Sequence, residues 1–215
     1  DAECSQILAQ CEEKLAEVMP LIDEAKNSIK KVKSNDLIEQ ASFKQLNTGC
    51  RILMTGLLYF LTGNDWKKKE YEKKEEGKGK SYDIKKALNY IDFNKSEDLL
   101  NRLRTFCQEP KLDELKEEPM LSNIRFMNEH FKVEGATIEM IKKSAVSLVG
   151  LYEFLILLSR YVENCITTID PIKKNLNEAQ IKKDQANRDK EEAIAKSNKA
   201  EETVRNLDAQ YKAAE

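Results

Sequence analysis

The 215-residue sequence is poor in the two residues that interrupt helices. It has seven glycines and four prolines, whereas 34% of its residues are charged. Few helix breakers and many Lys, Glu, Ala and Leu residues favour long helices, so we expect an all-α fold. The length suffices for one domain. The net charge of −2 does not indicate a nucleic-acid partner.

The sequence also lacks the patterns of metal sites, secretion and membrane insertion. No two of its five cysteines form CxxC and His130 is the only histidine, so a zinc site is not expected. Scattered cysteines indicate free buried thiols in a reducing compartment. The first residues, DAECSQ, do not resemble a signal peptide. The apolar runs at 52–61 and 148–158 are shorter than the roughly twenty residues that span a membrane, so we expect no membrane partner.

Common catalytic and nucleotide-binding motifs are missing as well. The sequence contains no GxxxxGK[ST], GxGxxG, HExxH or GxSxG. No Ser, Cys or acidic residue stands near His130 in a pattern typical of a catalytic triad, and we interpret this histidine as structural. We therefore predict that the chain is not itself an enzyme and needs no cofactor.

Residues 1–33 carry a regular heptad pattern. Spacings of four and three alternate, with Glu and Lys between the apolar positions, which are Cys4, Leu8, Cys11, Leu15, Val18, Ile22, Ala25, Ile29 and Val32. About four such heptads are typical of a coiled-coil helix. Pro20 lies inside this pattern, although a proline costs about 3 kcal/mol in a helix interior.

Residues 166–215 repeat the heptad pattern with a weaker core, and Pro171 interrupts it. The seam positions are Ile169, Ile172, Leu176, Ala179, Lys183, Ala186, Lys190, Ala193, Ser197, Ala200, Val204, Leu207, Tyr211 and Ala214. Because lysine, serine and alanine bury little apolar surface, this seam fixes its register poorly. Two interpretations remain open: a coiled coil whose register changes, and a solvated helix with a frayed end.

Residues 34–165 are the globular part according to their composition. They hold the only tryptophan, six of the seven tyrosines and all seven phenylalanines, which supply large buried areas. We expect Asp65 to cap a helix and Trp66 to lie in the core. The predicted helices are near 35–43, over 48–62, from Asp65 onward, near 96–107 and over 137–166.

The order of these segments predicts an antiparallel two-helix coiled-coil stalk capped by a small helical-bundle tip. The chain leaves through 1–33, forms the tip with 34–165 and returns through 166–215. The two heptad runs must therefore be antiparallel if they pair with each other. Parallel pairing of each run with a second copy is the alternative, but it would leave the ends of the tip far apart.

Four segments make the chain similar to the microtubule-binding domain and distal stalk of dynein heavy chains. VMPLIDEAKNSIKKVKSNDLIEQASF (18–43) resembles the end of the outgoing stalk helix and the first tip helix. CRILMTGLLYFLTGNDW (50–66) resembles the second tip helix, its glycine stop and the start of the third. IKKSAVSLVGLYEFLILLSRY (141–161) resembles the long fifth helix. TTIDPIKKNLNEAQ (167–180) resembles the returning stalk helix with its proline.

The resemblance implies a motor module that binds microtubules, the polymers of α/β-tubulin, together with the rest of a dynein heavy chain. In this family the two stalk helices slide by part of a heptad, which couples tip affinity to a distant ATPase ring. Pro20 and Pro171 would then mark the junctions where stalk helices meet the tip and bend or shift. A weak second seam is consistent with sliding. The resemblance implies a cytoplasmic, cytoskeletal location.

The resemblance also implies which residues touch the acidic surface of tubulin. They are lysines of the first tip helix, the third tip helix and the base of the returning helix, namely Lys30, Lys31, Lys33, Lys67, Lys68, Lys69 and Lys173. Their charge would control the on-rate and the salt sensitivity of binding. The alternative is that they are ordinary solvated surface lysines.

Several positions depart from the family pattern. Ala41, Thr168 and Glu70 stand where a basic residue is expected, and KQLNTG replaces the usual Pro-Pro before the second tip helix. Fewer bases predict weaker binding than in cytoplasmic dynein, which favours an axonemal isoform of a cilium or flagellum. Segments 67–86 and 108–131 look like insertions. We expect the first, which is rich in lysine, to be a flexible or partly helical loop able to reach acidic tubulin tails.

Two other functions are compatible with the sequence. A coiled-coil hairpin arm of a non-motor protein would grip another protein or a nucleic acid. Such an arm predicts a basic stripe along the coil, but residues 165–215 carry ten bases and ten acids. A helical-bundle enzyme would need polar groups that converge in a pocket, and the sequence does not indicate them.

Overall fold

The computed structural model describes residues 2–74, 77 and 79–214, and it confirms the all-α prediction apart from one short hairpin. The chain divides into two compact units. One unit contains Leu15–Thr168, and the other joins the described residues before Leu15 with those from Ile169 onward. The predicted tip begins at residue 34, whereas the larger unit begins at Leu15.

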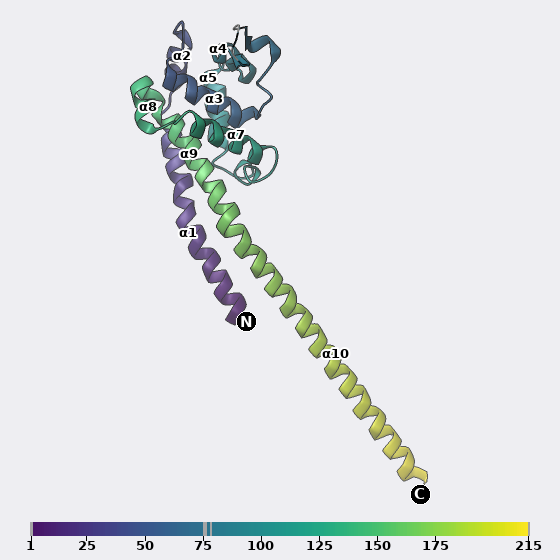
Figure 1. Cartoon of the computed structure of the whole chain (residues 1–215). Helices are drawn as coiled ribbons and strands as arrows, with labels where there is room; N and C mark the ends of the chain where they lie inside the picture. Colours follow the sequence, from purple (N-terminus) through teal and green to yellow (C-terminus); the bar gives the residue numbers. More distant parts are fainter. Residues whose placement is uncertain (1, 75–76, 78, 215) are drawn as a thin grey trace. The chain divides into compact units, whose positions relative to one another are not determined.

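Helices occupy most of the described chain, and a few 3-10 turns, a π-helical turn and two short strands connect them (Figure 1). The α-helices are α1 (Ala2–Lys30), α2 (Ser34–Ser42), α3 (Thr48–Thr62), α4 (Ile84–Ala87), α5 (Ser96–Thr105), α6 (Lys111–Glu114), α7 (Met120–Val133), α8 (Ile138–Ser144), α9 (Val149–Asn164) and α10 (Asp170–Ala214). The other elements are η1 (Lys69–Tyr71), β1 (Glu72–Lys73), β2 (Ser81–Tyr82), η2 (Leu88–Ile91), η3 (Val146–Leu148) and the π-helical turn η4 (Cys165–Ile169). The helices predicted near 35–43, over 48–62 and near 96–107 are confirmed within two residues.

The core of the larger unit forms around α3, which is buried on nearly all sides. Helix α7 packs along α3 (Figure 1) through Ile124, Met127 and Phe131, which repeat at helical spacing. The Phe131 ring reaches α3 at Gly56, where a Cβ atom would lie 2.2 Å from the ring. Segment 108–131 therefore contributes α6 and most of α7, and α7 builds the core, whereas the sequence suggested an insertion.

The second half of α1 packs in the same unit. Its heptad positions are buried at Val18, Ile22, Ala25 and Ile29, and the next one, Val32, is buried in the linker after α1. Helix α9 approaches this stretch very closely, because a Cβ atom on Gly150 would lie 2.4 Å from the Ser28 carbonyl oxygen. This close packing of α1 with α9 explains why the larger unit begins at residue 15 rather than at 34.

The predicted helix over 137–166 is broken, which corrects the sequence-based prediction. Ala145 is extended at φ −161° and ψ 84°, and it separates α8 from η3 and α9. Ser144 explains the break, because its carbonyl oxygen and its hydroxyl accept hydrogen bonds from the start of α3 and the residue before it instead of from its own helix. Its carbonyl oxygen accepts from Asn47 Nδ2 at 2.6 Å, and its hydroxyl accepts from Gly49 N at 3.0 Å.

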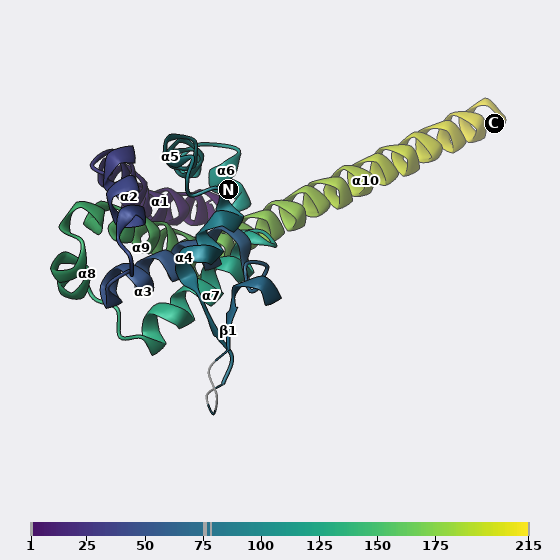
Figure 2. The same ribbon diagram turned by 90° about the horizontal axis from the view of Figure 1, so that it is seen from above.

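No helix starts at Asp65 either, so its predicted role as a helix cap is wrong. The chain turns at 62–66, and Trp66 is buried with its ring 5.3 Å from each of the Tyr59 and Tyr82 rings, which confirms its predicted core position. The chain then forms the antiparallel hairpin of β1 and β2, which projects away from the helices in Figure 2. The loop predicted for 67–86 is thus η1, the hairpin and the start of α4, while residues 75, 76 and 78 lie outside the described residues.

The smaller unit joins the start of α1 to α10. Glu3, Cys4 and Ile7 from α1 line a hollow with Ala179 and Lys183 from α10, among others, so the two segments lie side by side. The α10 seam is buried or half-buried from Ile169 to Lys183. Its described positions beyond residue 183 are all exposed.

The two prolines occupy different local structures. Pro20 is exposed inside α1, which continues without a break to Lys30. Pro171 is exposed at the second position of α10 and follows η4 directly. A π-helical turn is wider than an α-helical turn and often accompanies a local irregularity. The chain thus has a π-helical turn shortly before Pro171 and a continuous helix at Pro20, and the role of both prolines as junctions stays a prediction.

Candidate functional site

The lysines predicted to touch a partner are all exposed, and those between residues 30 and 33 line two different hollows. Lys30 and Lys33 line one hollow of about 420 Å³ together with Glu97 and Arg104, which we call the junction hollow. Lys31 lines a different one. The run Lys30–Lys33 therefore divides between two surfaces of the larger unit.

Local structure explains the position of Lys33. Helix α1 ends at Lys30, and the fully buried Val32 anchors the linker to the core. Lys33 is the N-cap residue of α2, with its backbone N donating to Asp36 Oδ2 at 2.8 Å. The backbone of Lys33 is therefore held on both sides, while its exposed side chain is free to rotate from that point.

Arg104 is the residue of the junction hollow that the sequence analysis missed. Its Nη1 donates to Asn101 Oδ1 at 2.8 Å and lies 3.6 Å from Glu97 Oε1, all on α5. Helix α5 packs against α2, which brings Arg104 beside Lys33. No local sequence signal predicts this pairing, because Lys33 and Arg104 are far apart in the chain and meet only through the packing of α2 against α5.

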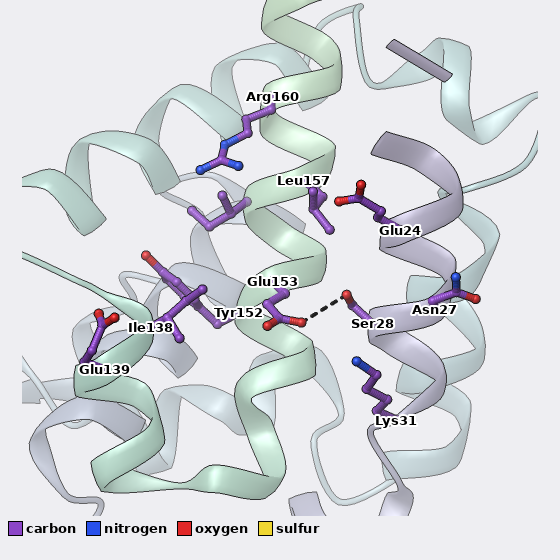
Figure 3. A pocket seen from close by; sticks show the side chains of 11 residues that line it. Glu24, Asn27, Ser28, Lys31, Ile138, Glu139, Tyr152, Glu153, Leu157 and Arg160 are labelled. Atoms are coloured by element: carbon purple, nitrogen blue, oxygen red, sulfur yellow. Dashed lines mark hydrogen bonds between the residues drawn. The ribbon is translucent and has the colours of Figure 1, made fainter. Parts of the chain in front are cut away.

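Lys31 lines a hollow of about 590 Å³ between α1, α8 and α9. Figure 3 shows Ser28 and Glu153 facing each other across it, and Ser28 Oγ donates to Glu153 Oε2 at 3.2 Å. Glu24 and Arg160 stand above this contact in the same view. Three carboxylates and two cations line the hollow, and the contact of Ser28 with Glu153 can hold α1 against α9.

Aromatic rings position two of the three lysines at 67–69, which the resemblance places at the start of the third tip helix. Lys67 Nζ lies 5.0 Å from the centre of the Tyr59 ring and 5.7 Å from that of Trp66. Lys68 Nζ lies 5.1 Å from the centre of the Tyr90 ring. Such cation–π contacts contribute about 0.5–1 kcal/mol at exposed sites and restrict where the charge lies. Lys69 begins η1 and is exposed.

Lys173 is exposed on α10 and belongs to the smaller unit, as does Pro171. Pro20 belongs to the larger unit. A common surface of Lys33 and Lys173 therefore stays a prediction of the resemblance.

The cysteines have the character of structural thiols. All five lie in the described part of the chain and none is in a disulfide; four are buried and Cys4 is half-buried. Burial raises the pKa of the Cys50 thiol to about 11, and it raises the pKa of the Cys107 thiol to about 11 as well. Both thiols are thus protonated and unreactive near neutral pH. The described residues include no group of three or more His, Cys, Asp and Glu side chains that could hold a metal, and no described helix could span a membrane.

His130 is half-buried and fastens α7 to α3. Its Nε2 lies 2.9 Å from the Ile52 carbonyl oxygen, and its ring lies 5.5 Å from the Tyr59 ring. Burial is the main cause that lowers the pKa of His130. The neutral form therefore fits the folded state better than the imidazolium does.

We expect the free energy of unfolding to decrease as the pH falls through the ordinary histidine pKa of about 6.5. Because the pKa of His130 is lower in the folded than in the unfolded state, its contribution is complete above that pH and disappears as the pH falls through the folded pKa. Urea titrations at pH 7.5 and 5.5 measure this. His130→Gln should show a smaller decrease between the two pH values than the native chain. An equal decrease in both would contradict the assignment to His130.

No family model, curated protein or solved structure matches the chain.

Proposed function

We propose that the chain is the microtubule-binding tip and distal stalk of a dynein-type motor. The observation that carries the proposal is the arrangement of the two heptad helices. Helix α1 and the start of α10 line one hollow in the smaller unit, and both continue into the same helical unit. In the proposal they pair as an antiparallel coiled coil, and residues 15–168 form the tip.

The proposed contact surface centres on the junction hollow and α2. Lys30, Lys33 and Arg104 supply positive charge there. On α2 and directly after it, Ile38 is 51% exposed and Phe43 is 47% exposed. Exposed apolar residues beside arginine and lysine are typical of protein interfaces, and here they would meet the acidic surface of tubulin.

The proposal includes control of affinity by the register of the two stalk helices. Three features support it. The α10 seam contains small and charged residues, the π-helical turn η4 stands next to Pro171, and a polar contact between Ser28 and Glu153 joins α1 to α9. A polar contact with few alternatives can distinguish one register from another, whereas a weak apolar seam tolerates both.

Co-sedimentation with polymerised microtubules at low salt tests the proposal. We expect saturable binding, and we expect no shift of duplex DNA by the same fragment. Binding to DNA but not to microtubules would favour the alternative, a coiled-coil hairpin arm of a non-motor protein. The observation that keeps this alternative open is the exposed seam of α10 beyond residue 183, which includes Val204, Leu207 and Tyr211 and is available to another protein.

A further inference from the structure

A second basic surface lies on the larger unit, apart from the residues that the resemblance singles out. It is a hollow of about 600 Å³ between the α2–α3 linker, α3, the hairpin and α4. Its cations are Lys44, Arg51, Lys73, Lys85 and Lys86. We call this hollow the basic groove.

The basic groove has an excess of positive charge that its own residues do not neutralise. Among the described residues, Asp83 is the single acidic side chain that lines it, against five basic ones. Asp83 Oδ1 already accepts from Lys86 N at 3.2 Å as the cap of α4. Within the described part of the chain, none of the five cations forms an ion pair with a carboxylate, unlike Lys80, which lies 3.4 Å from Glu72. The groove therefore attracts anions.

Tertiary contacts hold the walls of the groove together. Lys85 Nζ donates to the Phe43 carbonyl oxygen and ties α4 to the end of α2. Asp83 N donates to the Tyr71 carbonyl oxygen at 2.7 Å and ties α4 to the hairpin side. The groove is thus present before any partner binds, which lowers the entropic cost of binding.

We propose that the basic groove binds an extended polypeptide rich in glutamate or aspartate. The cations come from four separate segments, so they suit a row of single carboxylates better than one compact dianion. Leu46 and Ile84 lie between them and can contact the aliphatic parts of glutamate side chains. Gln45 and Asn89 offer amide groups to a peptide backbone.

The same lining disfavours a nucleic acid. Single-stranded nucleic acids bind through aromatic side chains on which bases stack, in addition to cations. Tyr82 is the one aromatic residue that lines the groove, and its ring already packs edge-on against Trp66 at 5.3 Å. No stacking surface is therefore available among the lining residues.

Fluorescence anisotropy with a labelled deca-glutamate peptide tests this proposal without tubulin, so its outcome is independent of the proposed microtubule function. The test variant is Lys44→Glu with Lys86→Glu, because both side chains are exposed and neither takes part in a side-chain hydrogen bond that holds the groove. We expect its dissociation constant to rise about tenfold, since two attractions become repulsions. Circular dichroism checks that its helix content equals that of the native chain.

The control variant is Lys95→Glu with Arg102→Glu, which changes the net charge equally at exposed positions on and beside α5. We expect its affinity to change about twofold or less. The proposal would be overturned by no binding of the peptide to the native chain, by equal losses in both variants, or by a single-stranded oligonucleotide of equal charge that binds the groove more tightly than the peptide. Inorganic phosphate should compete only weakly, and strong competition would assign the groove to a compact anion instead.

Discussion

Under the proposed function, we expect replacing Lys33 and Lys173 together by glutamate to lower the affinity for microtubules about tenfold, with helix content unchanged. Each exposed ion pair contributes about 0.2–1 kcal/mol, and a charge reversal replaces that attraction by repulsion. Two reversals therefore amount to roughly the 1.4 kcal/mol that corresponds to a factor of ten. Both side chains are exposed, so folding is unaffected. Co-sedimentation over a range of microtubule concentrations measures the change.

The matched control replaces Lys132 on α7 and Lys199 on α10, one exposed lysine in each unit. This variant should bind like the native chain. A further comparison uses two single variants. Lys33→Glu should weaken binding more than Lys31→Glu, because Lys33 lines the junction hollow of the proposed contact surface and Lys31 lines a different hollow. Equal losses in all of these variants would show that only net charge matters, and unchanged binding of the first variant would remove the proposed contact surface.

Gly150→Ala reduces the free energy of unfolding of the larger unit by about 1–3 kcal/mol, the usual cost of overpacking a well-packed interior. The new Cβ atom would lie 2.4 Å from the Ser28 carbonyl oxygen and 3.1 Å from Val32 Cγ2. A backbone atom cannot rotate away as a flexible side chain can, so α1 and α9 must separate. Urea denaturation followed by circular dichroism measures the loss.

Gly79→Ala is the control for this change. A Cβ atom at Gly79 meets nothing within 4 Å. Both substitutions restrict the unfolded chain in the same way, so the difference between them isolates the clash. If Gly150→Ala proves as stable as Gly79→Ala, the close contact of α1 with α9 in the structure is incorrect.

Local signals were sufficient to predict helices whose ends are set by nearby residues. Helix α3 is the clearest case. Asn47 Oδ1 accepts from Cys50 N at 3.0 Å at its start, and Gly63 ends it at φ +61°, where glycine is favoured. Both signals lie within a few residues of the helix, and the predicted range of 48–62 is the observed one.

Features that depend on contacts distant in sequence were not predicted. The break at Ala145 depends on bonds from Ser144 to Asn47 and Gly49, which are more than 90 residues away. Helix α7 was mistaken for part of an insertion because prolines punctuate 108–131, although its apolar residues at helical spacing were a usable signal. The grouping of exposed lysines has the same cause. That lysines are exposed is expected from their charge. That Arg104 shares a hollow with Lys33 and that Lys31 lines a different one depend on the packed structure.

The most direct test of the central proposal is the microtubule affinity of the fragment in two locked registers. Cys4 lines the same hollow as Ala179 and Lys183, which lie four residues apart on α10. One variant carries Ala179→Cys and the other Lys183→Cys, and each is cross-linked to Cys4, because the other native cysteines are buried. The two cross-links fix registers that differ by one helical turn.

We predict that both cross-linked forms bind microtubules and that their dissociation constants differ by about tenfold, which corresponds to roughly 1.4 kcal/mol of coupling between stalk register and tip. Without the cross-link, both variants should have the same dissociation constant for microtubules as the native chain. Equal affinities in the two registers would contradict register control, and no binding in either register or in the native chain would contradict the assignment to a microtubule-binding module.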